Sequence, residues 1–94
     1  MSDQTLYLVQ TSFSQTNYIL NQLEQIYNAQ DHVVLMGDAV LFVQDNRILN
    51  KKNLYVLEND AEILVEPLPN NIKMISYDQF AALILDFKRC VSLK

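Results

Sequence analysis

Short runs of strand-forming residues alternate with helix starts along the whole chain, and this alternation restricts the possible folds more than any other feature. Helical patterns with polar outer faces separate the runs. Four strand-then-helix units joined by short connections favour a mostly parallel sheet of about five strands between two helix layers. We therefore expect a three-layer α/β/α fold in a single domain, residues 1–94. Strands are predicted at 6–9, 32–36, 54–57 and 73–75, with 90–93 as a final edge strand.

The helical patterns differ in length. The first predicted helix has an apolar stripe at Ile19, Leu23 and Ile26, and the last has one at Phe80, Leu83, Ile84 and Phe87. Shorter helices are predicted at 39–43 and 63–65, with a turn at 44–47. A residue that can cap, followed three positions later by Glu or Gln, predicts a capping box at three helix starts. These boxes are Ser12 with Gln15, Asn59 with Glu62, and Ser76 with Gln79.

Composition adds limits on partners. Half of the residues are apolar, which for so small a domain suggests burial at a subunit contact as well as in the core. Eleven acids and seven bases give a formal charge of −4. The basic pairs Lys51–Lys52 and Lys88–Arg89 are interpreted as solvated charges and are too small to follow a phosphate backbone. We expect no direct contact with nucleic acid.

Sequence features also suggest a compartment. Residues 1–4 are polar and acidic, so no secretion signal is expected, and the apolar runs are far shorter than the roughly 20 residues that cross a bilayer. Cys90 is the only cysteine, which excludes an intrachain disulfide and fits a reducing environment. We therefore expect a cytoplasmic protein without membrane contact.

Candidate chemical groups at the carboxyl ends of the strands are few. The loop at residues 10–14 precedes a helix start, where anions bind, but it contains no glycine, and the chain has no glycine-rich phosphate motif. We expect its hydroxyls, and likewise Asp38, Asp60 and Asp78, to cap helices. No cofactor is predicted.

His32 and Cys90 lie 58 positions apart and form no metal-binding motif, so no metal is predicted. We expect His32, at the start of a strand, to be a solvated or hydrogen-bonded surface residue. Cys90 has two interpretations. It is either a small buried hydrophobe in an edge strand, which we favour, or a thiol activated by Lys88–Arg89.

Several segments together resemble the TusB/DsrH family. The opening at residues 6–12 is similar to that family's first strand and serine-containing loop. Residues 34–40 resemble its second strand with an Asp-Ala-Val step, and 54–60 resemble its third strand with an acidic helix start. Residues 75–80, with Leu83, resemble its closing Ile-x-Tyr-x-x-Phe segment. The four segments follow in family order over nearly the whole chain.

The resemblance implies a DsrE-like fold and a place in a heterohexamer with TusC-like and TusD-like subunits. Such a complex passes persulfide sulfur from a TusA-like towards a TusE-like carrier, and finally to 2-thiouridine at the tRNA wobble position. Some DsrH-type relatives have a cysteine in the first helix, but residues 17–25 here contain none. Because a persulfide carrier needs a thiol, we expect a non-catalytic subunit with no catalytic residue of its own.

Three alternatives stay open. The chain fits a DsrEFH-type subunit in sulfur oxidation, or a thiol sulfur carrier that uses Cys90. A free-standing module that binds a small anion at the first helix start is also possible on the pattern alone, although the missing glycine argues against it.

Overall fold

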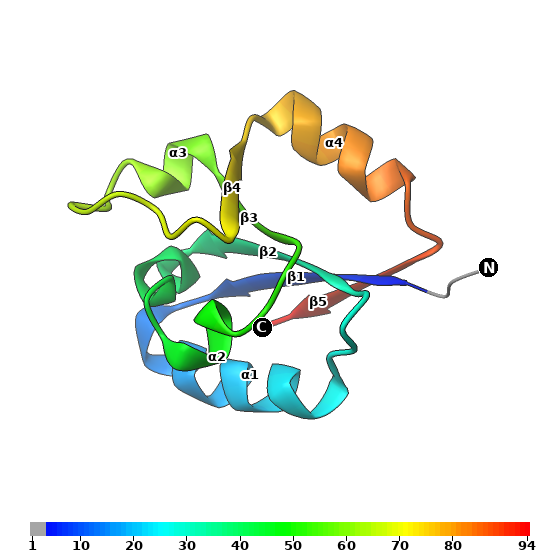
Figure 1. Ribbon diagram of the computed structural model, residues 1–94, viewed down its shortest axis with the longest axis horizontal. Helices are drawn as coiled ribbons and strands as arrows, with labels where there is room; N and C mark the ends of the chain where they lie inside the picture. Colours follow the sequence, from blue (N-terminus) through cyan, green and yellow to red (C-terminus); the bar gives the residue numbers. More distant parts are fainter. Residues whose placement is uncertain (1–3) are drawn as a thin grey trace.

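The computed structural model describes residues 4–94 and contains one sheet with strand order β4-β3-β2-β1-β5 (Figure 1). All four neighbouring pairs are parallel, which confirms the predicted α/β class. The sequence left the direction of the last strand open; it runs parallel to β1, with Cys90 opposite Leu6. Residues 1–3, on which the expectation about a secretion signal partly rests, lie outside the described part. The strands are β1 (Thr5–Thr11), β2 (His32–Gly37), β3 (Leu54–Leu57), β4 (Ile72–Ile75) and β5 (Arg89–Leu93).

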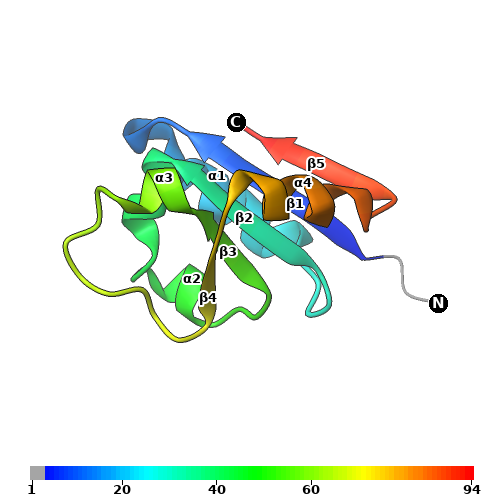
Figure 2. The ribbon, with the colours of Figure 1, turned by 90° about the horizontal axis from the view of Figure 1, so that it is seen from above.

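Helices cover the two faces of the sheet unequally. The long α1 (Phe13–Ile26) and the short α2 (Asn46–Leu49) lie on one face, and α4 (Tyr77–Leu85) lies on the other (Figure 1). A 3-10 helix, η1 (Asp38–Phe42), follows β2, and α3 (Glu58–Ala61) follows β3. Seen from above, α4 crosses the sheet and β5 forms the outer edge beside β1 (Figure 2).

Because the helices cover the two faces of the sheet unequally, the two hydrophobic clusters differ in size. The α1 face holds the larger one, in which Leu20 and Leu23 pack against Val33 and Leu35. The α4 face holds a smaller cluster, and no residue of Tyr77–Leu85 is fully buried. The predicted inner stripe of this helix does face the sheet, but its side chains are only half-buried. The stripe consists of Phe80, Leu83, Ile84 and, just after the helix, Phe87.

Only one of the three predicted capping boxes forms. The Ser76 hydroxyl accepts from the Gln79 nitrogen at 3.2 Å, and the Gln79 side chain accepts from the Ser76 nitrogen at 2.8 Å. Ser12 lies at the N-cap of α1, but its side chain makes no cap bond. The box at Asn59 and Glu62 is also wrong, because α3 already begins at Glu58, directly after β3.

Short elements between β2 and β4 differ from the predictions. The short helix predicted at 39–43 forms one residue earlier, as the 3-10 helix Asp38–Phe42. The predicted turn at 44–47 contains the start of α2, because the Asp45 carboxylate accepts from the Arg47 nitrogen and caps it. Residues 63–65 are not helical, since this stretch crosses back towards β4.

Lys51 was interpreted as a solvated charge and is in fact buried, with 5% exposure. Its ammonium group contacts the Glu24 carboxylate and the Arg47 carbonyl, and it lies 5.1 Å from the centre of the Tyr27 ring. A buried lysine needs such partners. Within residues 4–94, none of the helices has the length and apolar character needed to cross a membrane.

Candidate functional site

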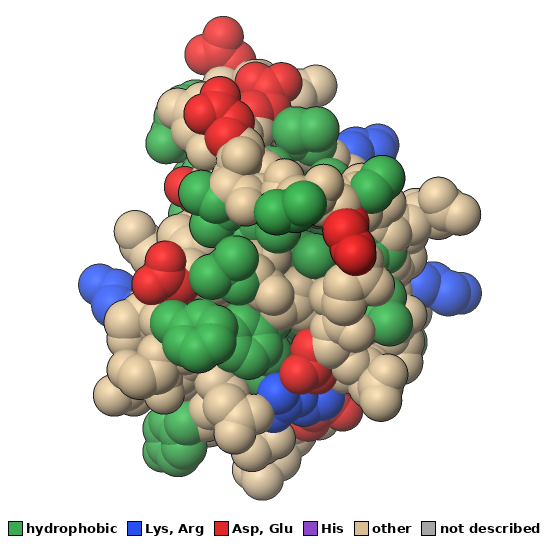
Figure 3. Space-filling model, turned by 90° about the vertical axis from the view of Figure 1, so that its left-hand side faces the viewer, with side chains coloured by type: hydrophobic (Ala, Val, Ile, Leu, Met, Phe, Trp, Pro, Cys, Tyr) green, Lys and Arg blue, Asp and Glu red, His purple; other side chains and the backbone are tan. Residues whose placement is uncertain are grey.

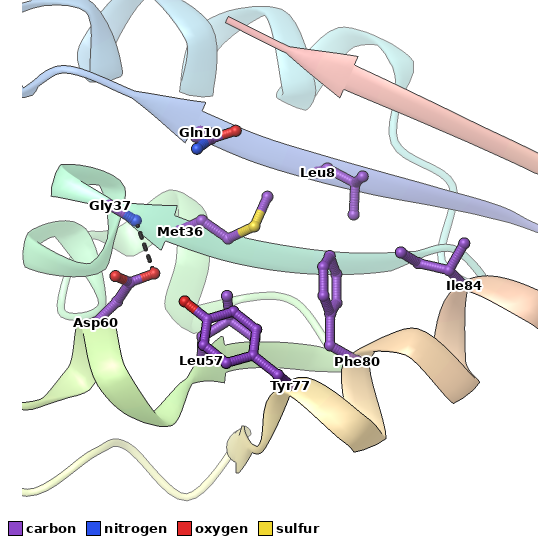
Figure 4. A pocket seen from close by; sticks show the side chains of 9 residues that line it. All are labelled: Leu8, Gln10, Met36, Gly37, Leu57, Asp60, Tyr77, Phe80 and Ile84. Carbon is purple, nitrogen blue, oxygen red and sulfur yellow. Dashed lines mark hydrogen bonds between the residues drawn. The ribbon is translucent and has the colours of Figure 1, made fainter.

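A cavity of about 430 Å³ opens between α4 and the carboxyl ends of the strands (Figure 4). Ligand sites in parallel sheets form at this end, beside the strand where the order reverses. Here β1 is that strand, because β2, β3 and β4 extend to one side of it and β5 to the other. The lining residues are Leu8 and Gln10 of β1, Met36 and Gly37 of β2, Leu57 of β3, Asp60 of α3, and Tyr77, Phe80 and Ile84 of α4.

The inner part of the cavity is apolar. Leu8, Met36 and Leu57 reach it from three neighbouring strands, and Phe80 points into it from α4 (Figure 4). Consecutive strand residues point to opposite faces, so Leu8 and Gln10 both face α4 while Val9 enters the other cluster. The cavity exists because the side chains of α4 only partly fill the space above β1 and β2.

A hydrogen bond between a backbone nitrogen and a carboxylate forms one rim of the cavity. Gly37 ends β2 with φ +59° and ψ −139°, a conformation that glycine adopts far more readily than other residues. Its nitrogen donates to Asp60 Oδ2 at 3.0 Å, as the dashed line in Figure 4 shows. Asp60 was expected to cap a helix start; instead its carboxylate joins α3 to the end of β2.

The neighbouring loop after β1 uses its hydroxyls for structure. Phe13, the first residue of α1, donates its backbone N–H to Asp38 Oδ2 at 3.1 Å. Asp38 therefore caps α1 from a different element, rather than capping the helix that follows it. The Thr16 hydroxyl bonds to the Thr11 hydroxyl at 2.6 Å and donates to the Ser12 carbonyl at 2.7 Å. The Phe13 N–H and the Thr16 hydroxyl, two donors that an anion at this helix start could use, thus already have partners.

The lining determines what chemistry the cavity supports. The Gln10 amide and the Tyr77 phenol can donate and accept hydrogen bonds, and the Asp60 carboxylate accepts them. The nine lining side chains include no thiol, amine or imidazole. Within residues 4–94, no three His, Cys, Asp or Glu side chains are arranged to hold a metal ion. The arrangement suits binding of an apolar group with a polar end.

His32 lies at the opposite end of the sheet, as predicted for a hydrogen-bonded surface histidine. Its Nδ1 shares a hydrogen bond of 2.8 Å with the Tyr55 hydroxyl, and its ring stacks on Tyr55 and meets Phe87 edge-on. Partial burial lowers the pKa of His32, and the nearby Asp31 carboxylate opposes that shift. Partial burial also raises the pKa of Tyr55. The three rings fasten the end of the α4 segment to the sheet.

Cys90 is exposed, so the prediction of a buried thiol is wrong. It is the second residue of β5, at the end of the sheet opposite the cavity, and its sulfur lies 4.0 Å from the Ile84 carbonyl oxygen. The side chain of Arg89 points to the other face and donates from Nε to the Thr5 hydroxyl at 2.9 Å. The predicted activation of the thiol by this guanidinium therefore has no geometric basis.

Most cavity residues were not identified as candidates from the sequence. Asp78, which was, lies exposed in the first turn of α4 outside the cavity lining. The one available signal was Gly37, the only glycine of the chain, which marks a backbone position that other residues rarely tolerate. Apolar residues such as Leu8 and Phe80 have the same pattern in a closed core as in a cavity wall.

Two of three comparisons with known proteins found a match. A family model described as "DsrH like protein" matches residues 11–90. The crystal structure of the ychN protein from E. coli is similar, with a TM-score of 0.64 over 98% of this chain and 100% of that chain. The two sequences are 14% identical, so this likeness establishes a shared fold alone. No curated protein sequence matches the chain significantly.

Proposed function

This chain belongs to the DsrH family of sulfur-relay subunits, and on that premise we propose that it is a non-catalytic subunit of a TusBCD-type complex. The complex would pass persulfide sulfur towards 2-thiouridine at the tRNA wobble position, in the cytoplasm. TusC-like and TusD-like subunits would be its direct partners in a heterohexamer. TusA-like and TusE-like carriers would deliver and receive the sulfur, with no contact between this chain and the tRNA.

One observation carries the proposal: the only thiol of the sequence and the cavity at the carboxyl ends of the strands lie at opposite ends of the described sheet. Sulfur relay proceeds by attack of a thiolate on a persulfide, which needs the thiol at the binding site. Cys90 is not placed to serve that cavity. The chain then contributes surface and shape, while a cysteine on another subunit accepts the sulfur.

Exposure of Cys90 is the specific observation that favours a second candidate, a sulfur carrier that uses this thiol. Access is one requirement for a carrier, since the donor's persulfide must reach the sulfur. The two candidates differ in a single measurable respect. A non-catalytic subunit transfers no sulfur itself, whereas a carrier forms a persulfide on Cys90.

The first test is the mass of the complex that an affinity tag on this chain recovers at native expression. We expect two similar-sized partners at a mass near that of a hexamer. Sulfur transfer is then measured with labelled persulfide, using the intact complex and its Cys90→Ser variant. Equal transfer by both supports the non-catalytic subunit, and loss of transfer in the variant supports the carrier. A lone monomer contradicts the non-catalytic subunit and leaves the carrier as the remaining candidate.

The pathway needs its own readout. Deleting the gene for this chain should reduce 2-thiouridine in total tRNA if the complex acts in wobble thiolation. If the tRNA is unchanged while oxidation of stored sulfur is impaired, the DsrEFH-type alternative holds instead. Restoring the gene with Cys90→Ser should restore the modification fully.

A further inference from the structure

A second groove, of about 320 Å³, lies between α3, the loop that follows it and the edge strand β4. Its floor is apolar and includes Leu64, Leu68 and Met74. Three carboxylates stand around this floor: Glu58, Glu62 and Glu66. The groove is separate from the cavity at the carboxyl ends of the strands, since the two have no lining residue in common.

The floor of this groove belongs to an uncovered part of the sheet. Met74 lies two residues after Ile72 on the same face of β4, and while Ile72 is buried, Met74 is 50% exposed. Two neighbours in the loop are also apolar and exposed: Ile63 at 53% and Val65 at 98%. Exposed apolar side chains that gather around a charged rim are typical of protein contact sites.

Charge along the chain is concentrated at the same place. Four of the eleven acids and none of the seven bases lie between residues 53 and 72. The rest of the chain has seven acids and seven bases, so this segment accounts for the formal charge of −4. Figure 3 shows acidic and apolar side chains together in the upper part of the face towards which β1 and β2 point. Glu58 and Glu62, four residues apart, repel each other in the absence of a cation.

None of the three glutamates has an ion pair within the described residues. The ion pairs found there join Arg47 to Asp45 and Lys51 to Glu24. Lys73 precedes Met74 in β4 and faces α4 instead. The carboxylates are also not arranged to hold a metal ion within residues 4–94. Their charge is thus available to basic groups from outside.

The groove is formed before any partner arrives. Leu64 and Leu68 pack partly against the larger hydrophobic cluster, so the loop is anchored to the core. Pro67 and Pro69 fix the φ angles of the same loop, and the Ile72 nitrogen donates to the Pro69 carbonyl at 3.1 Å. A rigid groove lowers the entropy lost on binding.

We propose that this groove docks a basic segment of a partner protein. Apolar side chains of the segment lie on Leu64, Leu68 and Met74, and its lysines or arginines contact the three glutamates while their aliphatic stems follow the floor. This inference goes beyond the proposed function, because the occupant is defined by charge and apolar surface and not by any sulfur pathway.

The probe is a synthetic twelve-residue peptide of lysines and leucines, titrated into the isotope-labelled full-length chain and followed by NMR. Amide signals of residues 58–66, 68 and 74 should shift. Binding should weaken strongly between about 0.1 M and about 1 M salt, where the Debye length falls from about 10 Å to about 3 Å. A matched peptide with glutamate in place of lysine should cause no shift, and one with serine in place of leucine should bind at least about threefold more weakly.

Paired variants distinguish binding at this groove from a general attraction of the basic peptide to an acidic protein. Glu62→Gln with Glu66→Gln should weaken peptide binding about tenfold. Asp78→Asn with Asp86→Asn removes the same charge from α4 and the residue directly after it, and should leave binding unchanged. All four side chains are exposed, so the folded spectrum should persist. Absence of binding at low salt, shifts elsewhere, or equal weakening in both variants would overturn the proposal. So would self-association of the chain through these residues with no peptide bound. None of these outcomes depends on sulfur transfer.

Discussion

The carboxylate of Asp60 accepts a hydrogen bond of 3.0 Å from the backbone nitrogen of Gly37. This contact joins α3 to the last residue of β2 across 23 positions of sequence. It also gives the cavity one rigid wall, because both residues line it. An unmade bond would leave a partly buried backbone donor without a partner, which is unfavourable.

Replacing Gly37 by Ala should destabilise the fold through backbone strain. A Cβ at this position would meet only the Thr11 carbonyl oxygen at 3.8 Å, so no steric clash is expected. An alanine rarely adopts the left-handed φ of +59°, so the backbone strain should lower the free energy of unfolding by roughly 1–3 kcal/mol. Urea denaturation followed by circular dichroism measures the loss. A variant as stable as the parent would show that this backbone conformation is not required.

Two serine-to-alanine substitutions should have unequal effects. Ser76 caps α4 through both bonds of its capping box, so Ser76→Ala should cost about 1 kcal/mol. Ser12 holds the same position before α1, but its side chain makes no cap bond, and Asp38 accepts from Phe13 instead. Ser12→Ala should therefore change the free energy of unfolding by less than about 0.5 kcal/mol. Equal losses in the two variants would contradict the assigned capping.

Replacing Arg47 by Lys should loosen the contact between α2 and α1. The guanidinium donates to the Asp45 carboxylate, to the Asn21 side chain and to both oxygens of Asn17. A lysine cannot reproduce this fork of donors, so we expect a loss of about 1 kcal/mol in chemical denaturation. Lys88→Arg is the opposite exchange at an exposed position and serves as the control. A neutral Arg47→Lys would show that charge alone suffices here.

Stability should fall as the pH drops through the range in which His32 titrates. Burial lowers the pKa of His32 in the folded state, so the unfolded chain binds the proton first. The contribution is therefore present above the ordinary histidine value of about 6.5 and is lost as the pH falls from there through the lowered folded pKa. Urea midpoints measured across this range should decrease for the parent and less so for His32→Gln. If the urea midpoints of the parent and the variant fell equally with pH, the loss of stability would belong to groups other than His32.

Elements with strong local patterns were predicted well. The strands at 32–36 and 54–57, the stripe of the last helix and the Ser76 capping box all depend on residues at most a few positions apart. Strand propensity, helical periodicity and a side-chain bond to the third following nitrogen are fixed by such neighbours. The order of these elements was also enough to predict the α/β class, because parallel strands need crossover connections.

By itself, the sequence determined the alternation of strands and helices, the family and the surplus of acid between residues 53 and 72. The tertiary structure decided which groups meet. Asp38 caps a helix 25 residues away, and Asp60 bonds a glycine 23 residues away, whereas their local pattern predicted caps on their own helices. The tertiary structure also exposes Cys90 to solvent, at the end of the sheet opposite the cavity. Contacts between distant segments depend on how the strands line up, and no local spacing encodes that alignment.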